Sequence, residues 1–242
     1  MKRISFILLL VISPVLFVCI WQKSLPAEGS DKVLIIIKES YGIDSGDRQF
    51  MESEEAIVMK QTLEEVGFMV HIASASGRTF LRDRVTYEGG VSIERVTLES
   101  DYKLGEVNVD NYIGFIITCS GLGRNTNYDS KQEPAFGETY SKPEEVAIAK
   151  QIVDSGKPVA AQDRAVIILA EAEVLEGKKY SYKHELQIGN AIYGGQGIVR
   201  DGNIITYAYC PYWGSLDQTV EITKALIDAC LLYTSPSPRD HG

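Results

Sequence analysis

Three polar residues, Gln162, Asp163 and Arg164, separate two apolar stretches of the chain. The stretch before them, residues 158–161, is typical of a short buried strand, and the stretch after them has the spacing of a helix over about residues 165–175. In an open parallel sheet, ligands bind where a strand ends and the chain turns into the next helix, and a sharp turn there can hold a nucleophile. The pattern therefore predicts a functional site at this corner.

Two further groups of polar residues follow apolar strands in the same way. Cys119, Ser120 and Gly121 come directly after the aliphatic run YIGFIIT, and Tyr209 and Cys210 come after the run NIITYA. Because the carboxyl ends of parallel strands meet at one edge of a sheet, these residues and Arg164 are candidates for the wall of a pocket.

Predicted strands and helices alternate along the chain, and these elements must position the polar residues. Residues 32–38, KVLIIIK, form a near-continuous aliphatic stretch, which is typical of a parallel strand buried on both faces. Amphipathic spacing with helix start and stop signals, such as Pro143 and Gly156, predicts helices. We expect helices at 52–66, 142–157 and 216–228, a second strand at 68–74, an antiparallel excursion within 84–101 and a hairpin turned at Asp201 and Gly202. Alternating strands and helices predict an α/β sandwich with a mostly parallel central sheet.

Composition excludes one class of partner. The 242-residue chain carries a formal net charge of -9 and has a pI near 5.0, whereas binding nucleic-acid phosphates requires clustered Lys and Arg. We therefore expect no nucleic-acid partner. The sequence contains no His and Cys cluster with metal-ligand spacing and no phosphate-binding glycine loop, so we expect neither a metal nor a cofactor.

The N-terminal residues predict export or membrane attachment. Lys2 and Arg3 precede a mainly apolar segment at residues 4–21. Pro14 and the short length favour a signal peptide, whereas the lack of a clean cleavage site favours an uncleaved membrane anchor. A third interpretation makes Cys19 a lipid-attachment site. All three place the domain outside the cytoplasm.

The C-terminal residues have an unusual composition. Residues 230–240, CLLYTSPSPRD, resemble the translation of a transposon sequencing-library adapter and begin within a helical pattern. We interpret residues 230–242 as foreign to the natural protein, and a genuine Ser/Pro-rich tail is the alternative. The expected organisation is a targeting segment and linker at 1–30, a domain at 31–229 and this tail.

The order and spacing of several segments resemble the ThiJ/PfpI family of the class I glutamine-amidotransferase-like superfamily. The segments are GKPVAA before the corner, AEVLEGKK after it, VNVDNYIGFII before Cys119, and VRDGNIITYAYCP before the last helix. The resemblance covers about residues 32–229 and implies a flavodoxin-like three-layer sandwich. Relatives often form dimers, so a homodimer is a further expectation.

Enzymes of this family are similar in holding a nucleophilic cysteine on the turn after the strand, a carboxylate from the first helix beside it, and a Gly-Gly pair facing it. By this resemblance the cysteine position falls on Asp163, the carboxylate on Glu55 and the glycine pair on Cys119 and Ser120. The resemblance thus implies a divergent member that lacks the nucleophile. Thiol-dependent peptidase, glyoxalase or deglycase chemistry at the turn is not expected, because a carboxylate is a far weaker nucleophile than a thiolate.

Two functions follow from these residues. The first is a non-catalytic module that binds an unknown small molecule or protein, with Asp163 neutralised by Arg164. The second is a hydrolase that uses Asp163 and Glu55 as a carboxylate pair, which would share a proton or bind a cation. The neighbouring loops of the family arrangement also imply a disulfide between Cys119 and Cys210.

Overall fold

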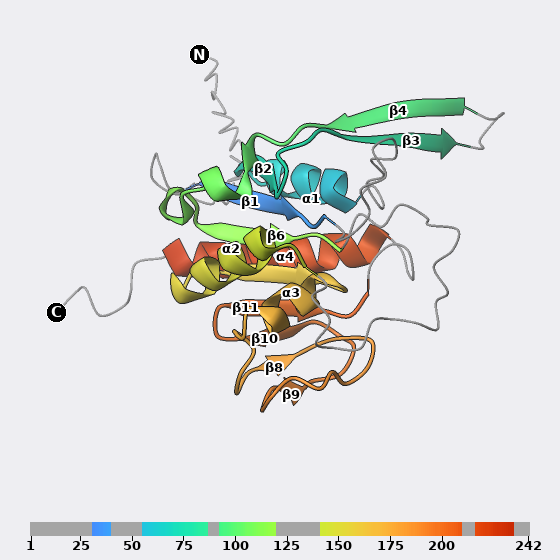
Figure 1. Ribbon diagram of the computed structural model, residues 1–242. Helices are drawn as coiled ribbons and strands as arrows, with labels where there is room; N and C mark the ends of the chain where they lie inside the picture. The colour runs from blue at the N-terminus through green and yellow to red at the C-terminus, as the bar shows by residue number, and fades with distance from the viewer. Residues whose placement is uncertain (1–30, 40–54, 87–91, 120–140, 210–215, 235–242) are drawn as a thin grey trace, which may run out of the picture.

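The computed structural model of the protein describes residues 31–39, 55–86, 92–119, 141–209 and 216–234. Within these residues, a central sheet lies between two layers of helices (Figure 1). The predicted three-layer α/β sandwich is confirmed.

The central sheet contains seven described strands in the order β10-β11-β7-β6-β1-β2-β5. Neighbouring strands are parallel except β10 and β11, which form the hairpin predicted around Asp201 and Gly202. The strands are β1 (Lys32–Ile37), β2 (Met69–Ser74), β5 (Tyr102–Lys103), β6 (Gly114–Ile117), β7 (Val159–Gln162), β10 (Val199–Asp201) and β11 (Ile204–Tyr207).

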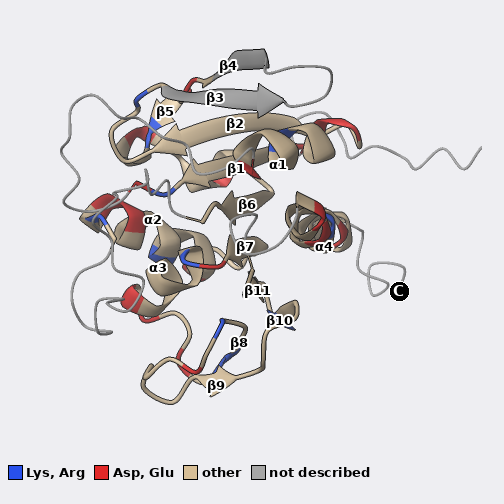
Figure 2. Cartoon of the chain, turned by 90° about the vertical axis from the view of Figure 1, so that its right-hand side faces the viewer, with Lys and Arg blue, Asp and Glu red and all other residues tan. Residues whose placement is uncertain are grey.

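Helices cover both faces of this sheet. Figure 2 shows α1 (Glu55–Glu64) and α4 (Leu216–Thr234) on one face, and α2 (Pro143–Asp154) and α3 (Ala165–Glu171) on the other. Each pair of helices is in contact across its own layer. The carboxyl ends of the parallel strands therefore meet at one edge, between the two helical layers.

The first strand shows why its sequence is continuously apolar. Val33 and Ile35 pack in the core under α1 and α4, whereas Leu34 and Ile36 pack in the core under α2 and α3. All four side chains are completely buried. Successive side chains of a strand point to opposite faces, so a strand covered on both faces needs an apolar residue at every position.

The start and stop signals of α2 act as the sequence predicts. Pro143 occupies its first turn, and the Glu145 carboxylate accepts a hydrogen bond from the Lys142 backbone N–H at 3.0 Å. Gly156 adopts φ +74° two residues after the helix ends at Asp154. Gly67 similarly follows α1 with φ +95°.

The ends of α3 and α4 differ most from the prediction. The expected helix at about 165–175 ends at Glu171, because Glu173 adopts the left-handed conformation (φ +58°) and turns the chain. The last helix, expected to end at residue 228, continues to Thr234. The predicted domain boundary after residue 229 therefore falls inside α4, and the foreign origin of residues 230–242 stays a prediction.

Two small strand pairs lie outside the main sheet. Strands β3 (Phe80–Thr86) and β4 (Ser92–Leu98) form the predicted antiparallel excursion and project beyond the layered body (Figure 1). Strands β8 (Lys179–Tyr180) and β9 (Ile192–Tyr193) form a short parallel pair beside β10. Between β5 and β6 lie two 3-10 turns, Leu104–Glu106 and Val109–Asn111.

The predicted targeting segment, residues 4–21, lies outside the described residues. Among the helices that the structure describes, none has the length and apolar character needed to cross a bilayer.

Candidate functional site

The turn between β7 and α3 has a strained backbone at Asp163. Asp163 adopts φ +47°, a conformation that Asp tolerates better than most residues. Its backbone N–H donates to the Tyr207 carbonyl at 2.7 Å, and its carbonyl accepts from the Val166 N–H at 2.9 Å. These bonds anchor the turn to β11 and to the first turn of α3.

Both oxygens of the buried Asp163 carboxylate have a partner. Oδ2 accepts a hydrogen bond from the Cys119 thiol at 3.2 Å, and Oδ1 lies 3.1 Å from Lys183 Nζ. The contact with Lys183 is an ion pair rather than a hydrogen bond, because Oδ1 accepts no hydrogen bond from any described residue. Sequence analysis named Arg164 as the counter-charge, and the structure adds Lys183.

Cys119 connects the two carboxylates that the sequence singled out. Its backbone N–H donates to Glu55 Oε1 at 2.8 Å, while its thiol donates to Asp163. Cys119, Glu55 and Asp163 are all at least 97% buried, with exposed fractions of 3%, 1% and 1%. The structure thus brings the end of β6, the start of α1 and the turn after β7 together at one cysteine.

Lys38, directly after β1, is a component of the site that sequence analysis missed. It is completely buried, and its backbone N–H donates to Thr118 Oγ1 at 3.2 Å. Burial lowers the pKa of the Lys38 ammonium; Glu145, Cys119 and Glu171 act against this shift, and Arg164 adds to it. The feature of the sequence that could have identified Lys38 is its position directly after a fully apolar strand.

A third buried carboxylate, Glu145, connects the end of β1 to the start of α2. Its Oε1 accepts from the Glu39 backbone N–H at 2.5 Å and its Oε2 from the Lys142 N–H. Burial raises the pKa of Glu145 to about 7, although the nearby Lys38 charge opposes the shift.

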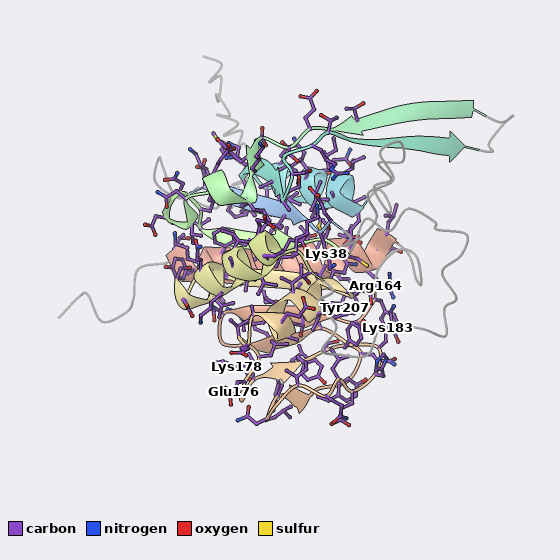
Figure 3. All side chains as sticks on the ribbon, viewed as in Figure 1. Lys38, Arg164, Glu176, Lys178, Lys183 and Tyr207 are labelled. Atoms are coloured by element: carbon purple, nitrogen blue, oxygen red, sulfur yellow. The ribbon has the colours of Figure 1, made fainter. Side chains whose placement is uncertain are left out.

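Glu39, the residue after Lys38, forms ion pairs at the same end of β1. Its carboxylate accepts from Lys142 Nζ at 2.6 Å and from the Ser76 hydroxyl at 2.6 Å, and lies 3.3 Å from Arg78 Nη2. Burial acts to raise the pKa of Glu39, but the hydrogen bonds from Lys142 and Ser76 outweigh it and hold the pKa below its usual range. Figure 3 shows Lys38, Arg164 and Lys183 toward the same side of the molecule, the end at which β1 and β7 finish.

The comparisons with known proteins identify the family. The sequence profile of the DJ-1/PfpI family matches residues 48–213, more than half of the chain. The chain belongs to the DJ-1/PfpI family. The resemblance to ThiJ/PfpI proteins inferred from the sequence is therefore confirmed.

Relatives of this DJ-1/PfpI chain match it over most of their length. An uncharacterized protein of Methanocaldococcus jannaschii is 26% identical over 234 residues, which is 93% of this chain and 98% of that protein. Among solved structures, the ThiJ/PfpI domain protein from Brachyspira murdochii is 19% identical with a TM-score of 0.53, covering 86% of this chain and 99% of its own. Drosophila melanogaster DJ-1beta is 20% identical with a TM-score of 0.52, covering 85% and 94%. At these identities the structures support the flavodoxin-like fold.

The structure describes some of the remaining predicted site residues of this DJ-1/PfpI domain and not others. Tyr209 is partly buried, and its carbonyl accepts from Gln162 Nε2 at 2.9 Å. Ser120, Gly121 and Cys210 lie outside the described residues. Cys119 is a reduced thiol in the structure, and its disulfide with Cys210 stays a prediction.

The histidines and carboxylates of the domain do not form a metal centre in its described part, where no three potential ligands are grouped. His71 Nδ1 lies 3.0 Å from the Tyr112 hydroxyl in the middle of β2, and His184 packs edge-on against Tyr182. The edge of the sheet instead carries paired charges of both signs, among them Asp163 with Lys183 and Glu39 with Lys142.

Proposed function

We propose that this DJ-1/PfpI domain is a non-catalytic module that binds a small molecule or a protein at the carboxyl edge of its sheet. The observation that carries the proposal is the engagement of both Asp163 oxygens, one by the Cys119 thiol and one by Lys183. A carboxylate held in this way is a poor nucleophile, because attack on a substrate would require it to leave both partners.

The chemistry of Cys119 supports the same proposal. A thiol attacks as the thiolate, whereas the Cys119 S–H donates a hydrogen bond to the Asp163 carboxylate in the structure. The side chain is also 97% buried. Thiol-dependent peptidase, glyoxalase or deglycase activity is therefore not expected.

A hydrolase remains the second candidate, since two buried carboxylates, Asp163 and Glu55, converge on Cys119. In that case Asp163 would act as the nucleophile or one carboxylate would act as the base for a water molecule. The Lys183 ion pair weighs against this candidate because it neutralises Asp163.

The proposed setting is outside the cytoplasm, with the N-terminal residues 4–21 acting as an export signal or a membrane anchor. A homodimer is part of the proposal, and nucleic acid is not, given the net charge of -9.

Turnover and binding assays on the same variants test the proposal. The wild type, Asp163→Asn, Glu55→Gln and Cys119→Ser would be assayed for ester and peptide hydrolysis and for methylglyoxal consumption. Asp154→Asn, an exposed carboxylate on α2, is the matched control. We expect no turnover by the wild type or by any variant above the rate without protein. Thermal shift with panels of small amines, carboxylic acids and sugars should reveal a ligand whose effect Asp163→Asn removes. Turnover that any of the three site substitutions abolishes would establish an enzyme instead.

A further inference from the structure

We propose that the domain docks on a zwitterionic lipid surface through the amino end of its sheet, the end at which the parallel strands begin. This end carries the exposed side chains of Val66 and Met69 and lies opposite the Asp163 turn, which follows β7. The carboxyl edge then faces away from the membrane. The inference goes beyond ligand binding and rests on the proposed membrane attachment through residues 4–21.

The chain enters the domain at the amino end of the sheet. Asp31 is the residue before β1, and its carbonyl accepts a hydrogen bond from the Met69 N–H at 2.9 Å. Nine residues, 22–30, separate Asp31 from the apolar segment at 4–21. A linker of this length spans at most about 32 Å when fully extended, so a membrane that holds residues 4–21 lies close to the start of β1.

Two apolar side chains are exposed beside this entry point. Val66 is 47% exposed and Met69 is 49% exposed, whereas Phe68 between them is 6% exposed and packs in the core under α1 and α4. The Phe68 N–H donates to the Leu63 carbonyl at 3.2 Å, which holds the turn against the end of α1. Phe68 thus fixes the turn with Val66 and Met69 on the outside. Transfer of apolar side chains from water into a lipid interface is favourable.

The last turn of α4 lies at the same end of the sheet, on the side where β1 begins (Figure 1). Cys230 there is in close contact with Gly114, the first residue of β6, and is followed by the exposed Leu232 and Tyr233. Four of the seven large apolar side chains exposed in the described residues therefore lie at this end. Leu232 and Tyr233 belong to the segment interpreted as foreign, so the proposal is based on the turn after α1.

The charges at this end indicate which lipid it suits. Glu64 and Glu65, at the end of α1, are exposed, and Lys60 pairs with Glu64. Lys157, just before β7, has the Asp110 carboxylate near it. Such a mixture of signs lacks the cluster of Lys and Arg that attracts anionic lipids. We therefore expect contact with a zwitterionic lipid, phosphatidylcholine.

Photochemical labelling by lipid tests the proposal on the full 242-residue chain. The protein would be reconstituted in phosphatidylcholine vesicles that contain a phosphatidylcholine with a diazirine near its headgroup, irradiated, digested with trypsin and analysed by mass spectrometry. We expect lipid adducts on residues 61–78, the tryptic peptide with both exposed side chains of the turn. We expect none on residues 184–200, where Ile192 and Ile198 are 49% and 39% exposed but lie beside β10, at the other edge of the sheet from β2.

Two double variants test whether the apolar side chains make the contact. Val66→Ser with Met69→Ser should lower the labelling of residues 61–78 about tenfold, because the variant loses the transfer free energy of two partly exposed apolar side chains. Ile192→Ser with Ile198→Ser, the matched control, should leave that labelling unchanged. Should the first variant not fold, Val66→Thr with Met69→Gln takes its place.

Adducts confined to residues 1–30 would keep the attachment and overturn the docking. Equal labelling of the two peptides, or labelling of residues 61–78 that survives substitution of Val66 and Met69, would overturn the docking too. Phosphatidylserine in the vesicles should not raise the labelling, and an increase would overturn the choice of a zwitterionic lipid. Recovery of the chain apart from floated vesicles would overturn attachment and docking together, while ligand binding at the carboxyl edge would stand.

Discussion

Asp163 occupies a left-handed backbone conformation that a glycine would adopt at lower free energy. The side chain nevertheless makes two contacts that glycine could not make, with Cys119 and with Lys183. Strain of about 1–3 kcal/mol at such a position persists where the surrounding structure holds it, often at a functional site. The carboxylate at the turn is therefore a feature of the site rather than a consequence of the fold.

Glu145 makes the stability of the protein depend on pH near neutrality. Its pKa rises from about 4.5 in the unfolded chain to about 7 in the folded protein, so between these values the folded state binds more protons. Stability should therefore fall as pH rises from about 4.5 to 7, by roughly 3 kcal/mol from this residue. Glu145→Gln, which resembles the protonated acid, should remove this component. Urea unfolding of both proteins at pH 5 and pH 8 measures the difference.

Glu144→Gln is the matched control for this measurement, because Glu144 lies in the same first turn of α2 but is exposed. This control should keep the wild-type dependence on pH. If the free energy of unfolding depends on pH in the same way in Glu145→Gln and in the wild type, Glu145 is not the source of the dependence.

At the scale of elements, α4 approaches β6 closely enough that position 114 must be a glycine. A Cβ atom at Gly114 would overlap Cys230 Sγ and contact Leu226 Cδ1 at 3.5 Å. Cys230 is completely buried, and burial raises the pKa of its thiol to about 12, as expected for a structural cysteine. Gly114 and Cys230 are therefore in close contact where α4 packs on β6.

We expect Gly114→Ala to destabilise the protein by about 1–3 kcal/mol through overpacking. Cys230→Ala makes room for the added methyl group, so the double variant should lose less stability than the sum of the single ones by at least about 0.5 kcal/mol. Urea unfolding measures all three. Gly105→Ala, where a Cβ would meet no atom within 4 Å, is the control. Strictly additive effects would contradict direct packing of the pair.

The elements themselves could be predicted well where burial alone decides them. The continuous aliphatic residues of β1 predicted a strand covered on both faces, and Pro143 and Gly156 predicted the limits of α2 to within about three residues. The end of α3 was not predictable, because Glu173 adopts φ +58° without the glycine that usually marks such a position. Local propensity there is overridden by the packing of the following turn.

At the scale of the whole molecule, the net charge of -9 conceals an edge that gathers charges of both signs. Lys38, Arg164 and Lys183 all lie at the carboxyl edge (Figure 3), where Lys183 pairs with Asp163 and Lys38 lies near Glu145 and Glu171. Composition describes the average surface and predicts no nucleic-acid partner, but it contains no information on which charges the fold gathers.

The N-terminal apolar segment, residues 4–21, predicts that the whole protein is exported. A reporter enzyme that is active only outside the cytoplasm, fused after residue 31 in a bacterial host, should become active. The same reporter fused to residues 31–229, without residues 1–30, is the control and should stay inactive. Equal reporter activity with and without residues 1–30 would show that these residues do not direct export.

The sequence by itself determined the layered fold, the family and the turn that holds Asp163, because apolar periodicity and strand-to-helix spacing are local properties of the chain. It also indicated Glu55 and Cys119, through the family resemblance. Only the tertiary structure decided that Lys183 faces Asp163, that Cys119 lies between two carboxylates, and that Lys38 and Glu145 are buried together. These contacts join residues up to 107 positions apart, and their energies depend on desolvation, which exists only once the helices cover the sheet.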